Sequence, residues 1–148
     1  MTFKIPIPND IQVKIGLECG SVYNFSPKKD IVNHYYMVVN RKPKDVEELF
    51  LVRFTSKKDV VLEFIKTHRL NEKTFVQVKK GECNALPKEE ESYINCNFIN
   101  KYDINTLVNL IDESNGRCYP KASNELVERI MEGLKSSRMI GKDIKEAL

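Results

Sequence analysis

One short segment of the chain combines residue types that could bind a phosphate group. Thr55 and Ser56 end an apolar run, and Lys57 follows at once. Where a strand ends and a helix opens, free backbone N–H groups and the helix dipole favour an anion. Arg53 lies two residues before Thr55, so on a strand both side chains share one face. The segment therefore predicts a phosphate site, unless Ser56 only caps the helix and Arg53 only faces solvent.

His34 is a second candidate for chemistry, because histidine titrates near neutral pH and can act as a general acid or base. It opens the stretch HYYMVVN, whose tyrosines could stack on a nucleobase or simply fill a core. The alternative for His34 is a strand-end residue that makes one hydrogen bond. Asn95 and Asn97 share one face of a later strand and indicate either a turn anchor or a polar site.

Several common chemistries are excluded because the chain lacks the sequence motifs that they require. The chain has no glycine-rich phosphate loop, no zinc-ligand pair and no serine-hydrolase motif. Its four cysteines are widely spaced, and neither histidine stands at ligand spacing from them. We therefore expect buried reduced thiols, no metal site and no cofactor.

Length and composition indicate one globular domain. The chain has 148 residues, of which 41% are hydrophobic and 30% charged, and its net charge is +3. A balance of 24 basic and 21 acidic residues is no nucleic-acid signature by itself, so any polyanion site must be local. No apolar run is long enough for a membrane span or a secretory signal. We expect a cytoplasmic protein.

The elements that must position these residues are mostly short strands. β-branched and aromatic segments predict strands at residues 21–26, 34–40, 49–56, 74–79 and 92–99. The stretch 34–40 is continuously apolar, as in a strand covered on both faces. Residues 57–68 have helical spacing, and Ser56 with Asp59 resembles a capping box at the start of that helix.

The last third is helical. Asp103 is the predicted N-cap of a helix that ends near Gly116, and Ser123 or Asn124 opens a second, amphipathic helix. The terminal GKDIKEAL predicts a short third helix. Strands followed by segregated helices indicate an α+β fold that is mainly β, a small antiparallel barrel with one inserted helix and two or three terminal helices. Within a single domain, residues 1–18 form an arm, 19–102 the barrel and 103–148 the helical part.

The order of these segments resembles the MazF/PemK (Kid-like) toxin family. GSVYNF is similar to the family's Gly-led first strand, HYYMVVN to a strand of the A-L-V-V-x-N kind, and LFLVRFTS to a strand that ends in a T-S pair. A late strand-to-helix segment, SYINCNFINKYDINTLV, and the terminal helix ELVERIMEGLKSS complete the pattern. The resemblance covers about residues 20 to 137.

The resemblance implies an SH3-like barrel with appended helices and a homodimeric, metal-independent endoribonuclease held in check by an antitoxin. In this reaction the RNA 2′-OH attacks the adjacent phosphate and leaves a 2′,3′-cyclic phosphate. A proton acceptor, a proton donor and cations or hydrogen-bond donors on the phosphate are required. By position, Thr55 and Ser56 match the T-S pair and would bind the phosphate.

The chain departs from the family at one point. An arginine in a G-x-R-P-type turn usually precedes the second strand, but the stretch KKDIVNHYY contains none. Arg53, on the face of Thr55, could substitute. We therefore predict the catalytic residues His34, Arg53, Thr55 and Ser56 and the RNA-binding residues Lys28, Lys29, Lys57 and Lys58. The alternatives are a non-catalytic barrel module that binds RNA or a partner peptide, and a structural or assembly protein.

Overall fold

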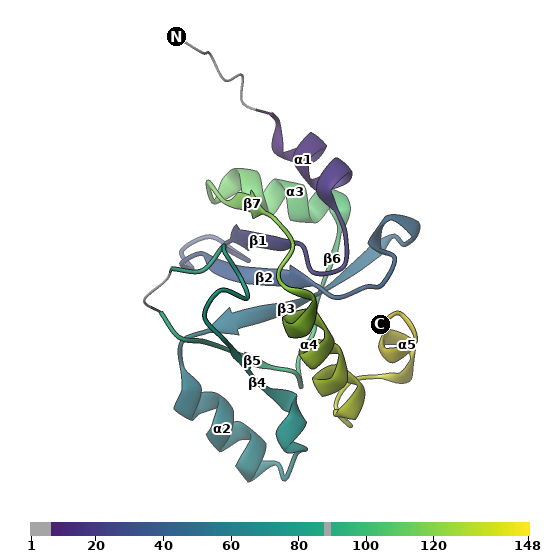
Figure 1. The fold of residues 1–148 in the computed structure, drawn as a ribbon. Helices are drawn as coiled ribbons and strands as arrows, with labels where there is room; N and C mark the ends of the chain where they lie inside the picture. The colour runs from purple at the N-terminus through teal and green to yellow at the C-terminus, as the bar shows by residue number, and fades with distance from the viewer. Residues whose placement is uncertain (1–6, 88–89) are drawn as a thin grey trace.

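The computed structural model describes residues 7–87 and 90–148, so residues 1–6 of the predicted arm lie outside the described part. Helices and strands alternate in short lengths along the chain (Figure 1). In chain order they are α1 (Asn9–Gly16), β1 (Val22–Phe25), β2 (His34–Val38), η1 (Pro43–Asp45), β3 (Glu48–Thr55), α2 (Lys58–Thr67), η2 (Glu72–Thr74), β4 (Phe75–Val78), β5 (Ser92–Asn95), β6 (Asn100–Asp103), α3 (Ile104–Glu113), β7 (Arg117–Tyr119), α4 (Asn124–Ser136) and α5 (Lys142–Glu146).

The strands form one antiparallel sheet around β3. The hydrogen-bonded order is β4-β5-β3-β2-β1-β7, and β6 pairs with β3 off this path. Along one edge of β3, residues 48–51 pair with β6 and residues 54–55 pair with β5. The other edge of β3 pairs with β2. β3 thus pairs with β5 and β6 along one edge and with β2 along the other, and so joins the two ends of the sheet.

The predicted α+β class with an antiparallel sheet is confirmed, and the sheet does not close on itself in the described residues. β4 and β7 are the two ends of the strand order, so the sheet stays open across the described residues. Helix α4 packs between these ends, and its Leu126 and Ile130 share one core with Val22 of β1 and Val76 of β4. Helical side chains therefore fill the space that strand closure would have used.

Each face of the sheet carries its own core. Side chains of α4 and α5 cover one face, and side chains of α1 and α3 cover the other. The prediction of a strand buried on both faces is confirmed in β2, where Met37 belongs to the first core and Tyr36 and Val38 to the second. The strand ends at Val38 rather than residue 40, because the buried Asn40 side chain hydrogen-bonds the backbone of Phe50 and Glu48.

The helix starts are partly as predicted. The Thr106 N–H donates to the Asp103 carboxylate at 2.7 Å, and the Leu126 N–H donates to the Ser123 hydroxyl at 3.2 Å, so both predicted N-caps are confirmed. The capping box predicted at Ser56 and Asp59 is wrong. Helix α2 begins after Lys57 with no side-chain cap.

Three elements were not expected. Residues 9–16, which lie in the predicted arm, form α1. The single strand expected over 92–99 is two strands, β5 and β6, on either side of a turn. In the part assigned to helices, residues 117–119 form β7, which extends the sheet beyond β1. β7 has only three residues, too few for an alternating pattern to stand out in the sequence.

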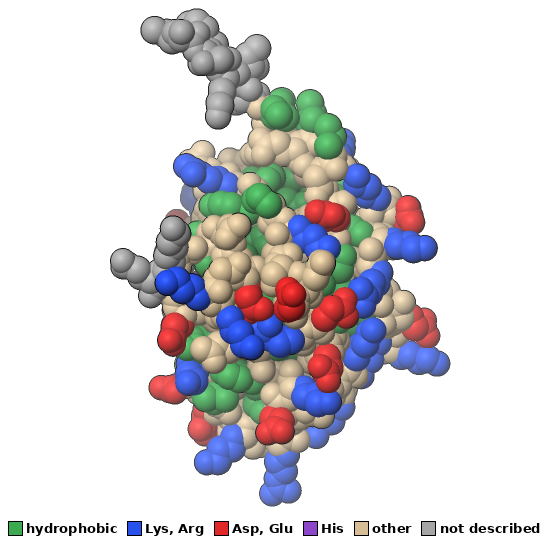
Figure 2. Space-filling model, in the orientation of Figure 1, with side chains coloured by type: hydrophobic (Ala, Val, Ile, Leu, Met, Phe, Trp, Pro, Cys, Tyr) green, Lys and Arg blue, Asp and Glu red, His purple; other side chains and the backbone are tan. Residues whose placement is uncertain are grey.

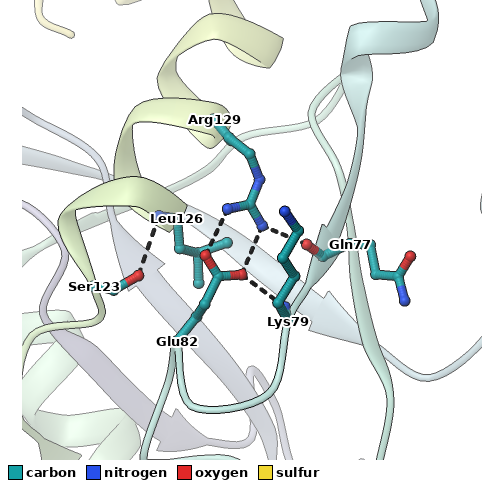
Figure 3. A network of polar contacts seen from close by, with 6 residues as sticks. All are labelled: Gln77, Lys79, Glu82, Ser123, Leu126 and Arg129. Carbon is teal, nitrogen blue, oxygen red and sulfur yellow. Dashed lines mark hydrogen bonds and ion pairs between the residues drawn. The ribbon is translucent and has the colours of Figure 1, made fainter.

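A polar clamp fixes α4 to the turn after β4 (Figure 3). Arg129 of α4 donates to both carboxylate oxygens of Glu82, at 2.5 and 2.7 Å, and to the Gln77 carbonyl at 2.6 Å. The Lys79 N–H donates to the same carboxylate at 2.7 Å, and the Ser123 N–H donates to the Glu82 carbonyl at 2.8 Å. Glu82 thus connects the loop after β4 to the start of helix α4 and to the second helical turn of α4.

The surface over α4 is mixed in charge. Figure 2 shows Lys and Arg side chains interspersed with Asp and Glu on this face, and apolar side chains at the end of the molecule that carries α1. The apolar group there includes the exposed Ile7, Ile11 and Ile15. Among the described residues, every helix is too short or too polar for a membrane-spanning segment.

Candidate functional site

Two of the predicted site residues, Arg53 and Thr55, lie on one face of β3. Arg53 stands directly opposite Tyr36 of β2, and Thr55 stands opposite Tyr93 of β5. Directly opposed residues of an antiparallel pair share a face. If the β2–β3 register is carried two residues past Tyr36, His34 stands opposite Thr55. One row through Tyr36 and Arg53 thus crosses the sheet, and Thr55 and Tyr93 form the next pair along β3.

Helices cover this face at both ends but leave its middle accessible. α1 and α3 bury Tyr36 at one end. At the other end lies α2, whose Lys58 ammonium stands 5.9 Å from the centre of the Tyr93 ring. Between them Arg53 is exposed, and His34 and Thr55 are half-buried. We call His34, Arg53, Thr55 and Lys57 the cationic strip.

The strip keeps its histidine neutral. Partial burial lowers the pKa of His34 below 6.5, and the positive charges of Arg53 and Lys57 lower it further. At neutral pH the imidazole is therefore uncharged and has a lone pair with which to accept a proton. This is the state that a general base requires.

Tyr36 contributes a buried phenol beside the strip. Burial raises its pKa to about 12, while the Arg53 guanidinium beside its hydroxyl acts in the opposite direction. Its ring stacks on Phe25 with centroids 4.3 Å apart. The phenol therefore stays protonated at neutral pH.

Thr55 is held in a turn that leaves its hydroxyl proton free to donate. The Lys57 N–H donates to the Thr55 oxygen at 3.1 Å, and the Lys58 N–H donates to the Ser56 carbonyl at 3.1 Å. Because α2 begins without a side-chain cap, its positive dipole end lies next to this hydroxyl. Asp59 in the first turn offsets part of that charge. A hydroxyl donor, a helix start and two cationic side chains suit a phosphate.

The structure brings only some of the predicted residues together. His34, Arg53, Thr55 and Lys57 form the strip, whereas Ser56 is exposed beside it. Lys28 and Lys29 are exposed in the β1–β2 connection, and neither is among the charges that shift the pKa of His34. Lys58 turns toward Tyr93. The RNA-binding roles predicted for these lysines stay predictions.

No three His, Cys, Asp or Glu side chains gather into a metal-binding cluster in the part of the chain that the structure describes. The four cysteines are free thiols. Cys83 and Cys96 are buried as expected, but Cys19 and Cys118 are only half-buried, because Cys118 lies on the terminal strand of the sheet and Cys19 in the connection before β1.

Sequence reasoning missed Phe98, which lies in the turn before β6. It was assigned to the interior of a strand, but its side chain is 48% exposed. The signal was present in the two asparagines that precede it, since Asn95 and Asn97 favour turns over strands. Tyr36 was weighed as either a stacking or a core residue, and the structure places it in the core.

Comparison with known proteins identifies the fold. No family model matches the chain, and no curated protein is similar to it in sequence. Sixteen chains of solved structures match it. One is an endoribonuclease in complex with its cognate antitoxin from mycobacterial species, with a TM-score of 0.52 over 85% of this chain and 96% of that chain, at 12% identity. The likeness confirms the predicted resemblance at the level of the fold.

Proposed function

We propose that the chain is a metal-independent endoribonuclease that cleaves single-stranded RNA, as the toxin of a toxin–antitoxin system. The observation that carries this proposal is the placement of His34, Arg53 and Thr55 at the ends of β2 and β3, on a sheet face that stays accessible. The likeness in fold to an endoribonuclease supports it. A neutral proton acceptor next to phosphate-binding groups is what cleavage by the RNA 2′-OH needs.

Each residue of the strip has a role in this reaction. His34 accepts the proton of the 2′-OH, whose oxygen attacks the adjacent phosphorus. The bond from phosphorus to the 5′ oxygen breaks, and that oxygen leaves with a proton from water. The products are a 2′,3′-cyclic phosphate and a 5′-hydroxyl end. Arg53 and the Thr55 hydroxyl stabilise the charge that grows on the phosphate oxygens, and Ser56 and Lys57 add contacts at the same phosphate.

The proposal extends to partners. The solved neighbour was captured with its cognate antitoxin, and we infer that this chain is likewise restrained by an antitoxin protein. We further infer a cytoplasmic homodimer, with Lys28, Lys29 and Lys58 as outlying contacts to the RNA backbone. Size-exclusion chromatography with light scattering tests the dimer, since one chain has a mass of 17.2 kDa.

The decisive experiment is cleavage of mixed single-stranded RNA in EDTA. Purified wild-type protein is compared with the double variant His34→Ala/Thr55→Ala and with Lys142→Ala, an exposed change on α5 at the opposite face. We expect cyclic-phosphate ends from wild type and Lys142→Ala. The double variant should lose on the order of 10²–10⁴-fold in rate, because it lacks the proton acceptor and a phosphate donor.

Other outcomes point elsewhere. Binding of RNA without cleavage by the wild type would replace this proposal with a non-catalytic RNA-binding module, which the missing arginine before β2 favours. Equal cleavage by wild type and double variant would show that the strip is not the active site. If the wild type neither binds nor cleaves RNA, RNA is excluded as the substrate.

A further inference from the structure

Phe98 is a large aromatic side chain that the fold leaves exposed. It is 48% accessible, although most aromatic residues of the chain are buried or half-buried. Its ring packs on Phe64 of α2 with centroids 4.9 Å apart, and Phe64 in turn packs on His68 at 4.2 Å. One face of a short aromatic column is thus presented to solvent.

The turn that presents Phe98 is rigid. The preceding residue, Asn97, is 2% exposed. Its amide nitrogen donates to the Thr74 hydroxyl at 2.9 Å and to the Asn95 side chain at 2.8 Å, and its oxygen accepts from the Ser137 hydroxyl at 2.7 Å. The Cys96 N–H also donates to the Thr74 carbonyl at 2.8 Å. A buried amide whose hydrogen bonds are all made fixes the turn, because movement of the turn would break those bonds. The position of Phe98 is therefore preorganised.

Phe98 also lies next to the cationic strip. β3 pairs with β6 through Leu51 opposite Asn100 and with β5 through Phe54 opposite Ile94, so the intervening turn passes beside residues 52 and 53. Residues 95–99 connect these two pairings, so Phe98 lies in the turn that spans this stretch of the β3 edge. Helix α2 lies over Tyr93, which stands opposite Thr55 on the face that carries Arg53, and the Phe98 ring contacts Phe64 of this helix. Aromatic surface and phosphate-binding charge are therefore neighbours on one face.

We propose that Phe98, backed by Phe64, is a stacking platform for a nucleobase of single-stranded RNA whose backbone phosphate is held by Arg53. This proposal rests on the proposed function and adds a base-binding subsite to it. A flat apolar ring beside a guanidinium matches a nucleotide, which joins a flat base to a phosphate. Stacking of this kind accepts every base, because each has an aromatic face.

The first test measures binding of a short mixed-sequence 2′-O-methyl RNA, which cannot be cleaved because its 2′ oxygen is blocked. Loss of one base–aromatic stack predicts that Phe98→Ala weakens binding by about 5- to 140-fold. Phe98→Leu keeps an apolar contact to Phe64 but should weaken binding too, since it has no ring. Val46→Ala, at an exposed apolar position in the β2–β3 connection, should leave binding unchanged.

The same oligonucleotide made with abasic sugars separates stacking from folding. Without bases there is nothing to stack, so Phe98→Ala and wild type should bind the abasic strand equally. A variant that had merely unfolded would lose binding to both strands. An effect of Phe98→Ala on binding of the strand with bases, but not of the abasic strand, therefore measures the contribution of the Phe98 ring.

A fluorescent reporter gives an independent readout. The chain contains no tryptophan, so Phe98→Trp creates a single emitter at the platform and Val46→Trp creates one away from it. We expect RNA to quench the first and leave the second unchanged.

The two proposals fail differently. If the wild type cleaves RNA while Phe98→Ala binds like wild type and Phe98→Trp is not quenched, the platform is wrong and the nuclease stands. In that case the exposed ring would serve a protein contact. If the wild type neither binds nor cleaves RNA, the proposed function falls and the platform falls with it.

Discussion

The charge state of one side chain decides what the strip can do. His34 stands at the start of β2, half-buried, where burial and two cations both lower the pKa of its imidazole. A histidine in solution would be partly protonated at slightly acidic pH. Here the neutral form persists to lower pH, so a base-catalysed reaction keeps its rate there. Because little of the protonated form is present at neutral pH, His34 is suited to accept the 2′-OH proton in the proposed reaction and not to donate one.

This electrostatic coupling is measurable. Replacing Arg53 or Lys57 by Gln removes a positive charge from the surroundings of His34, and we expect the pKa of His34 to rise toward 6.5 in either variant. Proton NMR titration of the imidazole checks this, with the signals assigned through His68→Asn. Lys142→Gln, at the opposite face, is the matched control. An unchanged pKa in both strip variants would mean that burial alone sets it.

At the scale of elements, the clamp between Glu82 and Arg129 is the clearest polar connection. The Arg129 hydrogen bonds lower the pKa of the Glu82 carboxyl below its ordinary 4.5, despite partial burial, which acts to raise it. A carboxyl with a lowered folded-state pKa adds stability above its unfolded pKa. That stability is lost as the pH falls below 4.5 through the folded-state value.

We therefore expect Glu82→Gln to lower the free energy of unfolding by about 1–3 kcal/mol at pH 7, because charged hydrogen bonds are replaced by neutral ones. The wild-type and variant curves should converge as the pH falls below 4.5, as measured by urea unfolding across pH. Glu132→Gln removes an exposed ion pair to Lys73 and should change stability by less than about 0.5 kcal/mol. A gap that persists unchanged into acid would rule out the carboxylate as the cause.

The elements that the sequence predicted well have strong local signals. Helix α3 has its Asp103 cap, α4 has its apolar stripe and Ser123 cap, and β3 has the apolar run 49–52, so local chemistry and tertiary structure agree. The division between β5 and β6 had a weaker local signal, the turn-favouring residues Asn95 and Asn97. It depends on Asn97 meeting Thr74 and Ser137, residues distant in sequence that only the fold brings together.

The candidate site was predictable to the same degree. Alternation along β3 placed Arg53 and Thr55 on one face correctly, because both lie inside a single strand. The positions of His34 and Phe98 relative to Arg53 depend on how separate segments pair, and no local sequence pattern specifies that pairing. The capping box failed because Thr55, one residue earlier, accepts the N–H of Lys57 and tightens the turn.

At the scale of the whole molecule, the net charge is +3 and the face over α4 is mixed in charge, so the RNA binding that we propose would depend on local contacts. If Arg53 and Lys57 neutralise two phosphates, the logarithm of the binding constant should fall against the logarithm of salt concentration with a slope of about −1.4. Lys57→Gln should reduce that slope by about 0.7. Fluorescence titration at several salt concentrations measures both.

The same titration tests the outlying lysines. If Lys28 and Lys29 also contact the backbone, the wild-type slope should be about −2.8, and Lys28→Gln/Lys29→Gln should bring it back to about −1.4. A slope that this double variant leaves unchanged would confine the phosphate contacts to the strip.

The double pairing of β3 has a consequence for how the protein is made. A ribosome that has synthesised residues 1–91 has already produced His34, Arg53 and Thr55, yet one whole edge of β3 still lacks its partners. Both missing strands, together with the turn that carries Phe98, emerge only with residues 92–103. Contacts between segments so distant in sequence form late. The sheet edge beside Arg53, and the turn that carries Phe98, are therefore complete only after residues 92–103 have been synthesised.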